Sequence, residues 1–348
     1  MEKITKKIRV GLEEVVSYLP ETVVKQEDMA YLDAYIPPGQ EAMFRGPEEF
    51  RRLRDECAVE IMAETVTLKA LDRAGLVPSD IDTIIAANIG GRRPFPMIGT
   101  YIHNKVKFSR ETPVINIQNF CAGFVDGINL AWDLILGGRH QRVLVVVVTA
   151  ETCKWGIDQT SPLAKNFGDG SAAAVVSSQN LKYEFLSYTN RIFGERYEHT
   201  YMDLLPVANP ELMEKAGYKE ERGIFLYNDG WIFDFDPVGE NYALNGIRQS
   251  LVAANLTTDD LDLVFIHHPG EVIHDPWVKG GIKGGISAEK WIPVLEGWNT
   301  LGNCGNVDVA WGLAEFTESG RIPEDAIIAL WTAGLGGHTP CMIIKRIG

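Results

Sequence analysis

Two stretches of this chain, Leu71-Asp-Arg-Ala-Gly-Leu-Val-Pro-Ser-Asp-Ile-Asp-Thr-Ile-Ile85 and Leu251-Val-Ala-Ala-Asn-Leu-Thr-Thr-Asp-Asp-Leu-Asp-Leu-Val-Phe265, match without a gap. Each predicts the end of a helix, a short polar turn and an apolar strand. A second match lies at nearly the same offset. There Gly138-Arg139 and the strand 143–148 correspond to Gly320-Arg321 and the strand 326–331. Two ordered matches indicate an internal duplication.

The duplication divides the chain into two α/β halves, predicted to span residues 1–178 and 179–348. Strands that are apolar on both faces require a sheet covered by helices. Duplicated units of this kind usually pack two-fold against each other, with sites where they meet. Residues 179–245 are the least regular, and their aromatic cluster 231–237 is interpreted as an insertion or cap.

Composition excludes several classes of protein. The 348 residues are 45% apolar and 23% charged, which is typical of a globular enzyme. A net charge of -14 argues against a nucleic-acid binder. The basic N-terminus is not followed by a signal-peptide core, and the longest apolar run, 143–148, is too short to span a bilayer. We therefore expect a cytoplasmic protein whose five cysteines are reduced thiols.

Cys121 is the leading candidate nucleophile. It follows the strand-like run 114–117 and precedes apolar residues at helical spacing, so it is predicted at a strand-to-helix turn. The positive end of a helix lowers a thiol pKa from its free value of about 8.5. The N–H of Cys121 can also face a developing oxyanion. A buried structural cysteine is the alternative.

The second half offers two further candidates. Asn303 and Cys121 both lie eighteen residues before the paired Arg321 and Arg139, so Asn303 is the two-fold mate of the nucleophile; a helix-capping Asn is the alternative. His267 and His268 end the predicted strand 263–266, where a histidine can act as donor or base. No metal site is expected, because no set of ligands is spaced to complete one.

Two glycine-rich turns, 167–170 and 334–337, precede strands at equivalent places of the halves. Neither has the Lys and Ser/Thr of a nucleotide phosphate loop. We instead expect a backbone turn beside Cys121, in which the Gly336 N–H is a second oxyanion donor.

Together these motifs resemble β-ketoacyl-ACP synthase III of the thiolase superfamily, in order over nearly the whole chain. They are the Cys-Ala-Gly-Phe box at Cys121, Phe-Gly-Asp-Gly-Ser-Ala-Ala-Ala at 167–174, Asp-Leu-Asp…His before residue 267, the Gly-Asn box at Asn303 and the terminal glycine turn. The resemblance implies a five-layered αβαβα thiolase-like fold, a homodimer and a Cys121-His267-Asn303 triad. It also implies that no metal or redox cofactor is needed.

In the implied reaction, Cys121 takes an acyl group from acyl-CoA or an acyl carrier protein. His267 and Asn303 then bind a malonyl-type thioester, whose decarboxylation gives the enolate for a Claisen condensation. The family's Asp-to-His spacing selects His267, whereas the following His-Pro-Gly resembles chalcone synthase and would select His268.

The chain departs from the family at positions that recognise substrate. Asp234, Glu271 and Asp275 occur where basic carrier-docking residues are common. The family's Trp and Arg-Thr-Gly-Ile segment is not visible, and the candidate phosphate contacts are Arg51, Arg52, Arg54, Arg92 and Arg93. These differences favour a specialised secondary-metabolism enzyme of fatty acid or polyketide type.

Three alternatives stay open. The first is acyl transfer to an O, N or S acceptor without condensation. The second is 3-hydroxy-3-methylglutaryl-CoA synthase-like aldol chemistry, which would need a catalytic Glu that the sequence does not reveal. The third is a non-catalytic partner subunit that binds acyl chains or a carrier, which would be expected to have lost Cys121.

Overall fold

The computed structural model describes residues 8–93, 95–150, 156–197, 202–205, 224–227 and 241–348. Its helices are α1 (Ala58–Ala74), α2 (Ile98–Val106), α3 (Gly123–Leu136), α4 (Tyr242–Ala253), α5 (Glu271–Lys283), α6 (Ile292–Leu301) and α7 (Asp308–Glu318). Its long sheet contains β1 (Gly11–Tyr18), β4 (Thr83–Gly90), β5 (Val114–Asn116), β6 (Arg142–Ala150), β7 (Asp169–Ser177), β8 (Tyr183–Thr189), β11 (Leu263–Ile266), β12 (Ile327–Trp331) and β13 (Cys341–Arg346). Two small sheets pair β2 (Val23–Lys25) with β3 (Glu49–Arg51), and β9 (Met202–Leu205) with β10 (Ile224–Tyr227).

The order of the strands repeats within the chain. The first half places them as β1-β7-β6-β4-β5, and the second as β8-β13-β12-β11. In each half a parallel pair, β4 with β6 or β11 with β12, is followed by antiparallel neighbours on one side. The first half adds β5, which is parallel to β4. Among the strands of the described residues, the two sets join through β1 and β8, at Gly11–Glu184 and Leu12–Tyr183. This order confirms the duplication predicted from the sequence.

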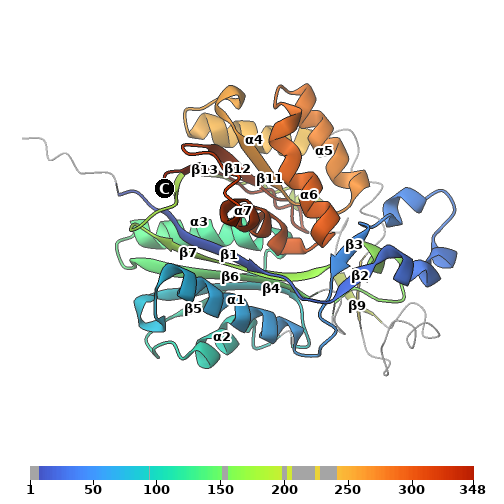
Figure 1. Ribbon diagram of the computed structural model, residues 1–348, viewed down its shortest axis with the longest axis horizontal. Helices are drawn as coiled ribbons and strands as arrows, with labels where there is room; N and C mark the ends of the chain where they lie inside the picture. The colour runs from blue at the N-terminus through green and yellow to red at the C-terminus, as the bar shows by residue number, and fades with distance from the viewer. Residues whose placement is uncertain (1–7, 94, 151–155, 198–201, 206–223, 228–240) are drawn as a thin grey trace, which may run out of the picture.

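The layers follow from which faces are apolar. Helices α3 and α7 are buried between the two sets of strands and share one core with both. Helices α1 and α2 cover the other face of the first set, and α4 and α5 cover that of the second. Figure 1 shows these five layers, with α4 and α5 uppermost and α1 and α2 lowest. The expected αβαβα thiolase-like fold is confirmed.

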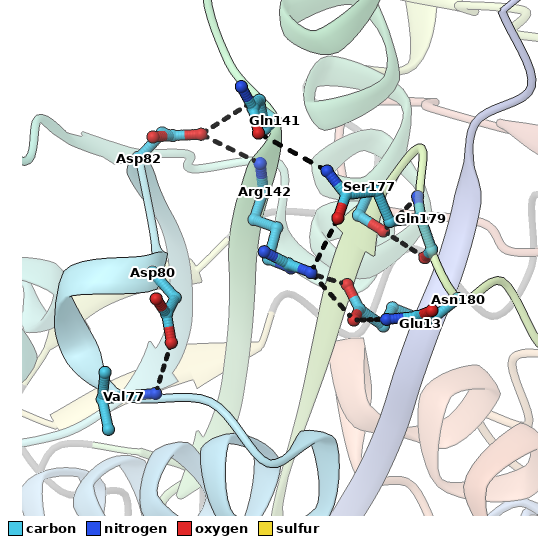
Figure 2. A network of polar contacts seen from close by, with 9 residues as sticks. All are labelled: Glu13, Val77, Asp80, Asp82, Gln141, Arg142, Ser177, Gln179 and Asn180. Carbon is cyan, nitrogen blue, oxygen red and sulfur yellow. Dashed lines mark hydrogen bonds and ion pairs between the residues drawn. The ribbon is translucent and has the colours of Figure 1, made fainter.

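The matching stretches form matching turns. The N–H of Leu76 donates to the Leu71 carbonyl at 2.9 Å, and Leu256 does the same to Leu251 at 2.8 Å. The carboxylate of Asp82 then accepts N–H groups that enter β6, as Figure 2 shows, and Asp262 accepts the N–H that begins β12. Each half therefore uses one Asp to align its central parallel pair.

The network in Figure 2 also ties β6 to β1, the middle strand of the long sheet. The Arg142 guanidinium contacts both carboxylate oxygens of the buried Glu13, at 2.8 and 3.3 Å, and the Gln179 amide. The hydrogen bond to Glu13 is the main reason that the Arg142 pKa is raised. This end of the sheet lies away from the ends where the candidate site residues follow their strands, and we assign it a structural role.

The predicted boundary at residue 178 falls between β7 and β8, and it stays a prediction. The whole aromatic cluster 231–237, which includes Asp234, and Cys153 lie outside the described residues. None of the described helices is both long and apolar enough to cross a membrane.

Candidate active site

Cys121 lies in a short 3-10 turn, Phe120–Ala122, directly before α3. The turn begins in an unusual conformation, because Phe120 has a φ of 48°, a left-handed value rarely taken by side chains other than Gly, Asn or Asp. Cys121 is 6% exposed. The hydroxyl of Thr332, just after β12, donates to the Cys121 carbonyl at 3.0 Å. The sequence prediction of a strand-to-helix turn is confirmed, and the second half of the chain holds that turn in place.

Asn303 lies in the equivalent turn of the second half, before the 3-10 turn Gly305–Val307 and α7. Its side-chain oxygen accepts the Gly305 N–H at 3.0 Å, so its Nδ2 remains the donor. That nitrogen lies 3.5 Å from the carbonyl of Pro269, in the loop that follows the two histidines. The Asn303 backbone bonds to both Asn166 and Gly168. The carboxamide is therefore fixed from both sides, with its N–H groups directed towards the histidine loop.

The two turns pack directly against each other. A Cβ added at Gly123 would lie 3.4 Å from Nδ2 of Asn306 and 2.9 Å from the Cβ of Ala87. The Asn306 oxygen in turn accepts the Thr149 hydroxyl at 3.0 Å. This close approach requires the small residues that the sequence provides after Cys121.

His267 follows β11, and its N–H donates to the carbonyl of Trp331 on β12 at 3.1 Å. Trp331 is adjacent to Thr332, which contacts Cys121. The Cys121 turn, His267 and Asn303 are therefore gathered where β11 and β12 end. His267 is 3% exposed, and its Nδ1 lies 2.6 Å from Oδ2 of Asp308, the first residue of α7.

His268 has different surroundings. Its ring lies in T-shaped contact with His274 of α5 and Trp298 of α6, with both centroid distances at 6.5 Å. Its Nε2 would be 2.6 Å from a Cβ added at Gly297. Burial lowers the pKa of His268 and lowers that of His274 to about 3. This ring packs between α5 and α6, so the geometry favours His267 as the histidine of the site.

The terminal glycine turn lies beside the Cys121 turn. A Cβ added at Gly334 would be 2.9 Å from the Asn119 carbonyl and 3.3 Å from the Ala122 N–H. Gly336 has a φ of 76°, where glycine is favoured. Its N–H has no hydrogen-bond partner among the described residues, whereas those of Gly334 and Gly337 are bonded within the turn.

The candidate phosphate contacts are not equivalent. Arg52 is only 1% exposed, and its guanidinium donates to Gln159 and to the Ala164 carbonyl. The hypothesis that Arg52 binds phosphate at the surface is therefore wrong, because this charge is needed inside the molecule. Arg92 and Arg93 line a pocket of about 390 Å³ between α1 and α2, where Arg92 pairs with Glu60.

Asp308 was not singled out from the sequence. An acid in the first turn of a helix is ordinary, because it complements the helix dipole. A signal was nevertheless present, since Asp308 lies five residues after Asn303 just as Asp126 lies five residues after Cys121.

The four cysteines in the described part of the chain, which are Cys57, Cys121, Cys304 and Cys341, are all thiols.

Two family models and a set of relatives match the chain. Residues 115–191 match the family described as 3-oxoacyl-[acyl-carrier-protein (ACP)] synthase III, and residues 251–346 match its C-terminal family. A β-ketoacyl-[acyl-carrier-protein] synthase III from Staphylococcus saprophyticus is 25% identical over 338 residues, covering 94% of this chain and 95% of the relative.

Solved structures show the same fold. The 3-oxoacyl-[acyl-carrier-protein] synthase III from Aquifex aeolicus superposes with a TM-score of 0.75 at 21% identity, covering 97% of this chain and 100% of that one. OleA from Xanthomonas campestris, with cerulenin bound, has a TM-score of 0.77 at 17% identity, covering 97% and 96%.

The fold and the family matches together define a condensing-enzyme type of acyltransferase in the thiolase superfamily. Within that class, the chain belongs to the β-ketoacyl-ACP synthase III-like enzymes.

Proposed function

We propose that Cys121, His267 and Asn303 form the active site of a cytoplasmic, homodimeric enzyme that condenses an acyl group with a malonyl-type thioester. The observation that carries this proposal is the meeting of their three turns at the ends of β11 and β12, through the Thr332–Cys121, His267–Trp331 and Asn303–Pro269 contacts. The relatives are named β-ketoacyl-[acyl-carrier-protein] synthase III, which supports a carrier-protein thioester as a substrate, and an acyl-CoA is proposed as the other acyl donor.

In the first step the Cys121 sulfur attacks the carbonyl carbon of an acyl thioester. A C–S bond to Cys121 forms, the C–S bond to CoA or the carrier breaks, and the thiol proton passes to the departing thiolate. The N–H groups of Cys121 and Gly336 are proposed to hold the oxyanion. Each such donor contributes about 2.7–4 kcal/mol to stabilisation of the transition state.

In the second step the malonyl-type thioester replaces the first carrier. His267 and the Nδ2 of Asn303 donate hydrogen bonds to its thioester carbonyl, which stabilises the enolate formed when the C–C bond to the carboxylate breaks and CO2 leaves. The enolate carbon attacks the acyl group. A C–C bond forms, the bond to Cys121 breaks, and the released thiolate takes a proton from water. Both steps balance without a metal or redox cofactor.

Transfer of the acyl group to an O–H, N–H or S–H acceptor is the second candidate function. The contact between His267 and Asp308 favours it, because an imidazole held by a carboxylate at Nδ1 can act as a base through Nε2. Asn303 favours condensation instead, since a protic acceptor has no carbonyl to be polarised.

The test is to incubate the protein with a panel of acyl-CoA and acyl-carrier thioesters and to locate the added mass by peptide mapping. We expect the adduct on Cys121, its loss in Cys121→Ser and its retention in Cys304→Ser. Malonyl-CoA is then added to the acylated protein. Release of CO2 together with a β-ketoacyl product supports condensation, whereas CO2 without a C–C product, or an adduct on Cys304, overturns it.

A further inference from the structure

Asp308 is a buried carboxylate that the proposed reaction does not yet use. Its side chain is fully buried, and it accepts two backbone N–H groups. Oδ1 accepts the Cys304 N–H at 2.8 Å. Oδ2 accepts the His268 N–H at 3.2 Å and faces Nδ1 of His267 at 2.6 Å.

These donors determine which nitrogen of His267 carries a proton. A carboxylate that accepts several N–H bonds is stabilised in its charged form. A charged carboxylate at 2.6 Å from Nδ1 can only accept, so Nδ1 must be the donor. Nε2 then has two states. It is a bare acceptor when the ring is neutral and an N–H donor when the ring is an imidazolium.

We propose that Asp308 is a positioning residue that makes His267 work in both half-reactions. Neutral His267 accepts the Cys121 proton and passes it to the departing thiolate, and His267 that has been protonated again from water then donates, as an imidazolium, to the extender carbonyl. This inference rests on the proposed function and deepens it. A histidine whose Nδ1 faced a backbone N–H would donate through Nε2 while neutral. It could not take the thiol proton.

Several other titratable groups lie near the His267–Asp308 pair. The His268 ring follows β11, and its Nδ1 lies 3.4 Å from Oδ2 of Asp308, while His274 lies on α5. Burial lowers the pKa of both rings, which favours their neutral forms. Cys304 supplies its backbone N–H to Asp308, and Cys121 is the proposed proton donor. Within the described residues, Asp308 is the one carboxylate in contact with the His267 ring.

The test is Asp308→Asn. The new NH2 group must replace one of the two oxygens. In the Oδ1 position the NH2 group would face another donor, the Cys304 N–H, at 2.8 Å. In the Oδ2 position it would face the His268 N–H at the longer distance of 3.2 Å. There it can also donate a hydrogen bond to Nδ1 of His267. The second orientation is therefore favoured. It moves the proton of the neutral ring to Nε2, so that the ring donates but no longer accepts.

Two rates are measured across pH: acylation of Cys121 by acyl-CoA, followed by intact mass, and CO2 release from malonyl-CoA by protein that has been fully acylated beforehand. We expect Asp308→Asn to slow acylation by about 10³–10⁴-fold, as a wrong tautomer does in a Ser-His-Asp triad. CO2 release should stay within about tenfold of wild type at low pH. It should also lose the decline at high pH that the proposal predicts for wild type, because Nε2 of the neutral ring in the variant still donates.

The matched control is Asp126→Asn, which alters a buried carboxylate at the equivalent position of α3. Asp126 accepts hydrogen bonds from Asn119 and Tyr188, and none of its partners in the described part of the chain is a histidine. This variant should therefore lose stability but keep the wild-type pH profile. If both rates fall together in Asp308→Asn and the profile of CO2 release keeps its shape, the inference is wrong. If the wild-type protein is not acylated at Cys121 by any thioester, the proposed function itself fails.

Discussion

The hydroxyl of Thr332 donates to the backbone carbonyl of Cys121 at 3.0 Å, and this bond joins the end of β12 to the turn that carries the proposed nucleophile. Thr332 is 1% exposed, so the bond is shielded from water. The residue before it, Trp331, accepts the N–H of His267. Trp331 and Thr332, at the end of β12, therefore bond to His267 from the second half and to Cys121 from the first half. Contacts of this kind bring unlike residues of the two halves together at one place.

Thr332→Val tests this relationship, because valine keeps the shape and removes the hydroxyl. Loss of a buried hydrogen bond should cost about 1 kcal/mol in the free energy of unfolding. We also expect acylation of Cys121 to slow several-fold, because its turn is less well held. Thr339→Val is the control, since its hydroxyl donates to the Arg191 carbonyl at 3.0 Å instead. It should lose similar stability in urea titrations while acylating normally; equal acylation rates in the two variants would contradict the argument.

Asn303→Asp separates the role of the carboxamide in the fold from its role in the reaction. The new carboxylate still accepts the Gly305 N–H that Oδ1 accepts now, so the turn should persist. It replaces the Nδ2 donor with a negative charge, which opposes formation of the enolate. We expect CO2 release from malonyl-CoA to fall by about 10²–10³-fold while acylation of Cys121 changes little. Equal loss of both activities would show that Asn303 acts only through the fold.

The sequence was enough to predict the duplicated fold, because the repeat includes residues with a fixed structural task. Asp82 and Asp262 accept backbone N–H groups in equivalent turns of the two halves. The strand 143–148 is apolar at every position, which predicts that both of its faces are buried. It was not enough to choose between His267 and His268. That choice depends on where each imidazole ring points in the folded protein. The packing of the His268 ring against Gly297 and Trp298 is what favours His267.

Charged residues were harder to predict than apolar ones. Arg52 lies in a run of arginines that predicts exposed charge, yet it is buried against carbonyl groups from the segment 159–167. Those partners are more than a hundred residues away in the sequence, so no local pattern reveals them. Asp308 was not predicted as a site residue for a related reason. Its partner His267 follows β11 and is distant from Asp308 in the sequence.

Gly168→Ala should disrupt the Asn303 turn. A Cβ at Gly168 would lie 2.1 Å from the backbone carbonyl oxygen of Leu301, an overlap that side-chain rotation cannot relieve. Because the Gly168 N–H donates to the Asn303 carbonyl at 3.0 Å, the movement passes directly to that turn. We expect lower thermal stability and a loss of condensation greater than the loss of acylation. Gly194→Ala is the control, since nothing lies within 4 Å of its added Cβ. Wild-type behaviour of Gly168→Ala would show that the segment can shift freely.

Asp82→Ala should destabilise the protein more than Asp262→Ala. Asp82 accepts two backbone N–H groups, from Gln141 at 2.6 Å and Arg142 at 3.0 Å, whereas Asp262 accepts one, from Ile327 at 2.8 Å. With hydrogen bonds to an exposed carboxylate worth about 1 kcal/mol each, we expect losses of about 2 and about 1 kcal/mol in urea unfolding. Neither variant should change the acylated residue. The opposite order of stability would mean that the two turns are not equivalent in energy.

His274 predicts how stability depends on pH. Burial among Trp298 and the other histidines lowers its pKa to about 3, against about 6.5 in the unfolded chain. Between these values the unfolded chain binds a proton that the folded protein does not. The stabilising contribution is therefore complete above pH 6.5 and is lost as the pH falls towards 3. At pH 5 the loss from this group is about 2 kcal/mol relative to pH 7, since each pKa unit corresponds to about 1.4 kcal/mol.

The variant His274→Gln has no titrating group at this position, so its free energy of unfolding should fall by about 2 kcal/mol less than that of wild type between pH 7 and pH 5. An equal fall in both proteins would show that His274 takes up its proton inside the fold.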